Sequence, residues 1–133
     1  MKLELLIFTF CFISVKLQNP SGLAEIMAAH RICTSRTGIS PALATGIISG
    51  RFPNDPILKQ HLLCVNQQLG VQDQSGRIQT NRVSQLATNL SNSPSADISA
   101  IVSRCAVQKS TPQDTAFDLV KCMWQARRSG RLQ

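Results

Sequence analysis

Cysteine is the residue type in this chain with the clearest chemical options, because thiols form disulfides or ligate metals. Gaps of 30, 40 and 16 residues separate Cys33, Cys64, Cys105 and Cys122, and a fifth cysteine, Cys11, lies near the N-terminus. A zinc site needs clustered ligands, as in C-x2-C. No such pair occurs, and neither histidine completes one. We therefore expect no metal ion and no cofactor.

The N-terminal stretch is typical of a secretion signal. Lys2 precedes an apolar run over residues 5–13, shorter than the ~18 residues that a membrane span needs. We interpret residues 1–22 as a signal peptide, cleaved between about residues 18 and 24. A buried N-terminal helix is the alternative, but Pro20 and Gly22 interrupt it. Residues 23–133 then form one extracellular domain with two disulfides, for which three pairings are open.

The charge of the chain restricts its partners. The net charge is +7, and removal of residues 1–24 leaves +6. Such a charge suits an anionic membrane or an acidic receptor face, or simply keeps the protein soluble. A nucleic-acid surface is not expected, because the basic residues are scattered, few aromatics accompany them and tyrosine is absent. Arg127, Arg128 and Arg131 form the one basic cluster, in a tail that we expect to be solvated and frayed.

Apolar spacing and capping residues predict an all-α fold of six short helices. Two helix starts pair a capping residue with proline, at Ser40 and Asp55, and Thr111 begins the last helix in the same way. Thr80 is expected to cap the fourth helix. The last helix is apolar on more than one face, which predicts burial among the others. The expected helices cover about 25–35, 41–48, 56–69, 80–90, 98–105 and 113–128.

Enzyme signatures are absent from the sequence. Neither G-x-S-x-G nor H-E-x-x-H occurs, and there is no phosphate-binding loop. The acidic residues lie mostly at expected helix starts or exposed faces, where Asp55 and Asp114 suit caps or the helix dipole. No carboxylate pair is placed for acid–base chemistry. We expect a protein that is not an enzyme.

Two stretches of sequence give the chain a family resemblance. The segments that carry it are FPNDPILK at 52–59, CV at 64–65, LG at 69–70 with Asp73, Gly76 and Ile78, CAVQK at 105–109, TP at 111–112 and TAFDLVKC at 115–122. The pattern resembles the insect pheromone- and general-odorant-binding proteins over essentially the whole of residues 23–133. The resemblance implies six helices around an internal hydrophobic cavity, and a secreted carrier of odorants or pheromones in sensillum lymph or haemolymph.

The chain departs from this family at two positions. The usual family has six cysteines, and the two that are missing correspond here to Gln60 and Gln113. Both partners of one bridge are therefore lost together, as in the four-cysteine Minus-C subgroup. By this resemblance the remaining pairs are Cys33–Cys64 and Cys105–Cys122. We expect side-chain packing alone to hold the third helix to the sixth, and a cavity that opens more readily.

The candidate ligand-binding residues are mostly apolar, because burial against a ligand yields about 25 cal/mol per Å². Ordinary core packing is the alternative for each apolar residue, and a solvated position is the alternative for Asn66. The resemblance places the sixth helix in the cavity wall. The candidates are Ile26, Ile47, Leu62, Asn66, Leu86, Leu90, Ile101, Phe117, Val120, Met123 and Trp124.

Further features leave alternatives open. His30 and His61 suggest pH-dependent release of a ligand, but the sequence supplies no partner, and we expect an exposed imidazole at His61. Asn89 begins a glycosylation motif. Competing functions are a non-olfactory carrier in haemolymph or glands and a cationic, membrane-active defence protein. The expected partners are a small hydrophobic ligand and an olfactory receptor or membrane surface, with the protein a monomer or weak homodimer.

The double substitution Gln60→Cys with Gln113→Cys tests the alignment of the missing bridge. We expect the two thiols to oxidise to a disulfide and to raise the melting temperature, because a cross-link restricts the unfolded chain. Thiol titration and thermal unfolding measure the two effects. A folded variant whose new thiols stay reduced would contradict the alignment at these positions.

Overall fold

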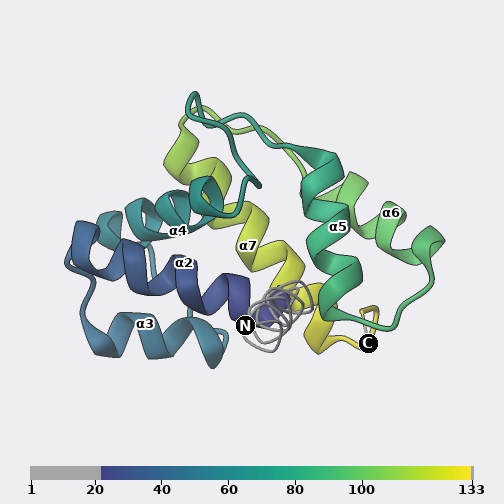
Figure 1. Ribbon diagram of the computed structural model, residues 1–133, viewed down its shortest axis with the longest axis horizontal. Coiled ribbons are helices and arrows are strands. Elements are labelled where there is room, and N and C mark those ends of the chain that lie inside the picture. Colours follow the sequence, from purple (N-terminus) through teal and green to yellow (C-terminus); the bar gives the residue numbers. More distant parts are fainter. Residues whose placement is uncertain (1–21, 133) are drawn as a thin grey trace, which may run out of the picture.

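The computed structural model describes residues 22–132 and shows six helices and no strand within them (Figure 1). The all-α prediction is thereby confirmed. The proposed signal peptide, with Cys11, lies outside the described residues apart from Gly22. None of the described helices has both the length and the apolar character that crossing a membrane requires. The helices are α2 (Gly22–Thr37), α3 (Pro41–Ile48), α4 (Pro56–Gln68), α5 (Thr80–Leu90), α6 (Ser95–Cys105) and α7 (Pro112–Arg128).

Three helix starts follow the expected chemistry. The side chains of Ser40, Asp55 and Thr111 each accept a hydrogen bond from a backbone N–H of the first turn, and proline follows each of them. The prediction for α5 is wrong, because its capping position is Gln79 and Thr80 is already helical. Gln79 is held extended by the bond from its N–H to the carbonyl of Val71 (2.8 Å), so the preceding loop sets where α5 begins.

Helix α7 runs through the molecule between two groups of helices (Figure 1). Helices α2 and α4 pack together, and α4 packs on α7; on the other side α5 packs on α6, and α6 on α7. The buried residues form two separate apolar clusters. One cluster, centred on Leu58, Leu62 and Phe117, joins α3, α4 and α7, and the other joins α2, α5, α6, α7 and the C-terminal tail. The prediction that the last helix is buried among the others is confirmed.

Two disulfides each join a pair of neighbouring helices. Cys33 on α2 pairs with Cys64 on α4, and Cys105 on α6 pairs with Cys122 on α7, with Cα–Cα distances of 5.8 and 5.5 Å. The expected pairing is confirmed. By loop-closure entropy each bridge stabilises the fold by roughly 3–4 kcal/mol.

An ion pair holds α4 to α7 where the third bridge is missing. Lys59 Nζ lies 2.8 Å from Asp114 Oδ1, and these residues adjoin Gln60 and Gln113. The hydrogen bond from Lys59, and a second one that involves Thr111, lower the pKa of Asp114 below its ordinary value. The expectation that packing alone holds this contact is therefore wrong. The pair is partly exposed, so it contributes little stability compared with a disulfide.

Glycine is required at position 50 by the backbone conformation there and by the contact with Trp124. Its φ of +78° is unfavourable for residues with a side chain, and a Cβ there would overlap the ring of Trp124. We expect Gly50→Ala to lower the free energy of unfolding by about 3 kcal/mol, from backbone strain and overpacking together. Denaturant unfolding followed by the fluorescence of Trp124, the single tryptophan of the chain, measures this loss.

Gly38→Ala is the matched control for this substitution. Gly38 has a similar φ of +67°, but nothing lies within 4 Å of the position a Cβ would take. It should therefore lose only the backbone part, about 1 kcal/mol. Equal losses in the two variants would show that the contact with Trp124 is unimportant.

Candidate functional site

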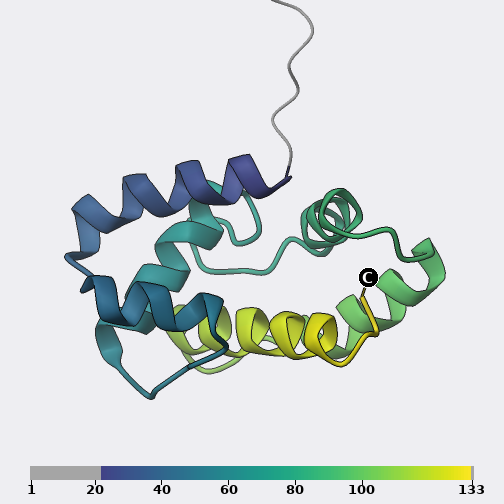
Figure 2. The same cartoon turned by 90° about the horizontal axis from the view of Figure 1, so that it is seen from below.

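The two apolar clusters leave a cavity of about 390 Å³ between them. Its volume lies within the usual range for small-molecule sites, about 300–1,000 Å³. Helices α2, α3, α4, α5 and α7 form its walls, together with the C-terminal tail. Figure 2 shows α2 and α7 along opposite sides of the molecule, with α4 and α5 between them. No acidic side chain contributes to the wall among the residues described.

The structure brings nine of the eleven candidate ligand-binding residues to this cavity. Ile101 and Phe117 are the exceptions, since both are buried in the core away from it. Phe117 lies nearer the start of α7 than any residue of this helix on the cavity wall, and its ring packs edge-on against Phe52. The nine residues on the wall are Ile26, Ile47, Leu62, Asn66, Leu86, Leu90, Val120, Met123 and Trp124.

Several residues on the wall were missed by sequence reasoning. Met27 and Ile48 line the cavity although they are 43% and 78% exposed, which places them at its opening with the exposed Arg127. A signal existed for Met27, because Ile26, Met27 and His30 follow the i, i+1, i+4 pattern of one helix face. No comparable pattern marked Ile48 and Arg127, which the structure shows to be exposed.

The C-terminal tail does not fray at Leu132. This residue is buried and lines the cavity, contrary to the expected solvated tail. The N–H groups of Arg131 and Leu132 both donate to the carbonyl of Ala126, and Gly130 has a φ of +76°. The chain therefore turns back after α7 and directs Leu132 inward.

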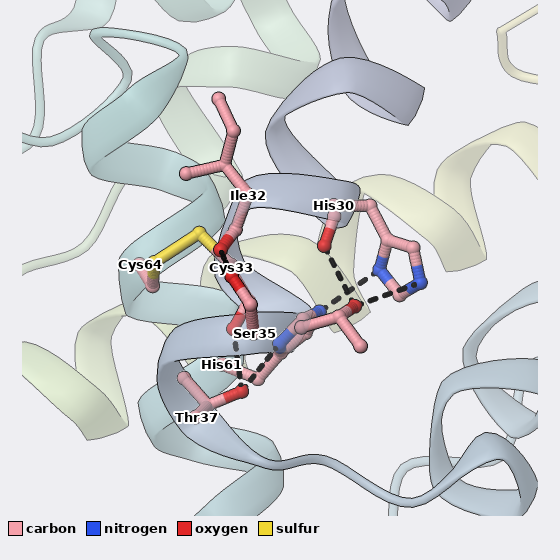
Figure 3. The surroundings of a disulfide bond; sticks show 8 residues. His30, Ile32, Cys33, Ser35, Thr37, His61 and Cys64 are labelled. Carbon is pink, nitrogen blue, oxygen red and sulfur yellow. Dashed lines mark hydrogen bonds between the residues drawn. A yellow bond between two sulfur atoms is a disulfide. The ribbon is translucent and has the colours of Figure 1, made fainter.

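His61 is fully buried on the cavity wall, so the expected exposed imidazole is wrong. The hydroxyl of Thr37 donates to the carbonyl of Cys33, so its oxygen is left to accept from His61 Nδ1, 2.9 Å away. His61 Nε2 is then the acceptor for His30 Nδ1, also at 2.9 Å (Figure 3). Burial, and next the charge on His30, lower the pKa of His61 from 6.5 to about 4. The ring is therefore held neutral beside the Cys33–Cys64 disulfide.

Asn66 is also buried, so the alternative of a solvated side chain is wrong. Its Nδ2 donates to Gln72 Oε1 at 2.8 Å, and both side chains are almost fully buried. Gln72 Nε2 in turn donates to the carbonyls of Gly76 and Pro112. This chain of bonds fixes the orientation of both amides and connects the cavity wall to the start of α7.

Other candidate features have a clear position. Asn89 is exposed in the last turn of α5, so its side chain is accessible. No group of three or more metal-binding side chains that could hold an ion occurs within residues 22–132.

Comparison with known proteins identifies the class of this fold and cavity. The model of the PBP/GOBP family matches residues 17–126. The B2 protein of Tenebrio molitor is 33% identical over 91 residues, 68% of this chain and 70% of that protein. The chain therefore belongs to the PBP/GOBP family.

Solved structures show the same fold. The odorant-binding protein dmelOBP28a of Drosophila melanogaster aligns with a TM-score of 0.67 and 21% identity, over 81% of this chain and 94% of that one. Odorant Binding Protein 7 of Anopheles gambiae, in complex with an azo compound, aligns with a TM-score of 0.60 and 23% identity. That alignment covers 87% of this chain and 93% of the mosquito protein.

The low pKa of His61 predicts a pH-dependent stability. Folding lowers this pKa from 6.5 to about 4, so the unfolded chain takes up the proton first as the pH falls. The stabilisation is complete above pH 6.5 and is lost between pH 6.5 and 4, by about 3 kcal/mol. Urea unfolding across this range, compared with His61→Gln, isolates the effect. Parallel stability curves for the two proteins would contradict it.

Proposed function

We propose that the protein is a secreted, extracellular carrier that binds small hydrophobic molecules, such as odorants or pheromones, in this cavity. The observation that carries the proposal is the apolar cavity between the two clusters, in a chain of the PBP/GOBP family. The mosquito protein of the same fold is in complex with an azo compound, which supports a small organic ligand for this cavity. We propose no catalytic role and no cofactor.

The cavity can supply useful affinity. A ligand that buries about 400 Å² of apolar surface gains roughly 10 kcal/mol. Association costs at least about 4 kcal/mol of that gain. The remainder of at most about 6 kcal/mol corresponds to a dissociation constant of tens of micromolar or weaker, which allows both loading and release.

The opening of the cavity suggests where a partner would meet the carrier. Met27 and Ile48 are exposed apolar residues at the rim, and Arg127 lies beside them with no acidic partner among the described residues. We propose that this rim faces an olfactory receptor or an anionic membrane when ligand is delivered. The same cavity would serve a non-olfactory carrier in haemolymph or glands, and tissue expression separates these roles.

Saturable uptake of N-phenyl-1-naphthylamine tests the proposal. We expect Val65→Phe, on the cavity wall, to weaken binding at least about tenfold because the added ring occupies the ligand volume. Ile57→Phe is the control, on the same helix but 43% exposed and off the cavity. Quenching of Trp124 gives an independent readout. Equal affinities in the two variants would contradict the assignment of the cavity, and leakage of anionic vesicles without saturable uptake would favour the defence function.

A further inference from the structure

The bonds around Asn66 leave one polar atom of the cavity wall without a partner. Gln72 Nε2 donates to two carbonyl oxygens, so its Oε1 is the end that faces Asn66, and Asn66 must present its Nδ2 to it. The remaining atom, Asn66 Oδ1, receives no hydrogen bond from any described residue. Every fully enclosed side-chain nitrogen or oxygen in the described residues does have a partner. Oδ1 is therefore accessible, and it is reached from the cavity, because Asn66 lines the cavity and is only 4% exposed overall.

We propose that Asn66 Oδ1 is a fixed acceptor that selects ligands carrying a hydrogen-bond donor, namely neutral alcohols and phenols, over ethers, esters and hydrocarbons of the same shape. This inference rests on the proposed carrier function and names the ligand class for the same cavity. A ligand that cannot donate takes water away from Oδ1 and leaves a buried acceptor unsatisfied, which is more costly than an unmade bond in water. A carboxylate ligand would meet an acceptor there and is disfavoured at this end.

The other polar groups of the wall do not replace Asn66. His30 and Ser91 also line the cavity, but both are only partly buried, so water competes for any acceptor they offer. His30 Nδ1 is engaged by His61, and the hydroxyl of Ser91 donates to a backbone carbonyl of α5. Both ring nitrogens of His61 are already engaged, by His30 and Thr37. The hydroxyl of Thr45 donates to a backbone carbonyl of its own helix, and Thr45 is exposed, so water competes for its oxygen. Arg127 is exposed at the opening and is a donor only. Asn66 is therefore the buried group of the described wall that can still accept a hydrogen bond from a ligand.

Two isomers test the proposal, 1-decanol and nonyl methyl ether, because they contain the same atoms but only the alcohol donates. Each is used to displace N-phenyl-1-naphthylamine, and the ratio of the two affinities is compared between proteins, which cancels their different solvation in water. We expect Asn66→Leu to shift this ratio about tenfold in favour of the ether. Gln68→Leu, on the exposed face of the same helix, should leave the ratio unchanged, and so should Thr45→Val.

Wild-type protein provides a second measurement, since Asn66→Leu also removes the partner of Gln72 Oε1 and could impair folding. The ¹³C shift of the Asn66 side-chain carbonyl should move on saturation with 1-decanol and stay in place with the ether. An unchanged affinity ratio in folded Asn66→Leu, a loss of preference in Thr45→Val instead, or equal carbonyl shifts with both isomers would overturn the proposal. If neither isomer displaces the probe, or the probe itself does not saturate, the carrier function fails rather than the role of Asn66.

Discussion

The division of apolar contacts along α7 is the constraint on which the rest of the structure depends. Leu119 belongs to the cluster with α5 and α6, whereas Ala116 and Phe117 belong to the cluster with α3 and α4. A helix that packed all its apolar residues into one core would leave no room between the two clusters. Because α7 contributes to both clusters, they stay separate, and the side chains between them become a cavity wall. Each disulfide then joins neighbouring helices on one side of this arrangement.

The polar groups at the cavity are fixed by bonds that reach away from it. Asn66 is connected through Gln72 to the loop at Gly76 and to Pro112 on α7. The turn itself is closed by Asp73, whose Oδ1 accepts from the N–H groups of Ser75 and Arg77. The hydroxyl of Ser75 also donates to Oδ1, and this bond, followed by the one from the N–H of Arg77, lowers the pKa of Asp73. The carboxylate therefore serves the turn, and the turn positions the amides that give the cavity its chemical character.

Local chemistry was sufficient to predict most of the fold. The helix starts at Pro41, Pro56 and Pro112 depend on a cap and a proline that are adjacent in sequence, so a single reading of the chain finds them. The start of α5 depends on a bond from Gln79 to Val71 across the loop, which no local pattern reveals. The disulfide pairing likewise came from family resemblance, because spacing alone left three solutions.

The candidate site was less predictable, because it also depends on contacts between residues that are far apart in the sequence. Periodicity identifies a buried face but does not say whether core or cavity lies beyond it. Ile101 and Phe117 were candidates for this reason, although both are buried away from the cavity. His61 was misjudged because its partners, His30 and Thr37, lie 31 and 24 residues away. Hydrogen-bond partners at such separations are decided by tertiary packing, and local sequence patterns do not reveal them.

The cavity lowers the stability of the fold, and the disulfides raise it. Apolar side chains on the cavity wall make fewer contacts with protein atoms than they would in a filled core, and the missing contacts reduce stability. Two disulfides that each contribute roughly 3–4 kcal/mol act against this loss. A small domain can therefore keep such a cavity although one bridge of the usual three is absent. A ligand that fills the cavity contacts the same wall residues, so ligand binding stabilises the fold.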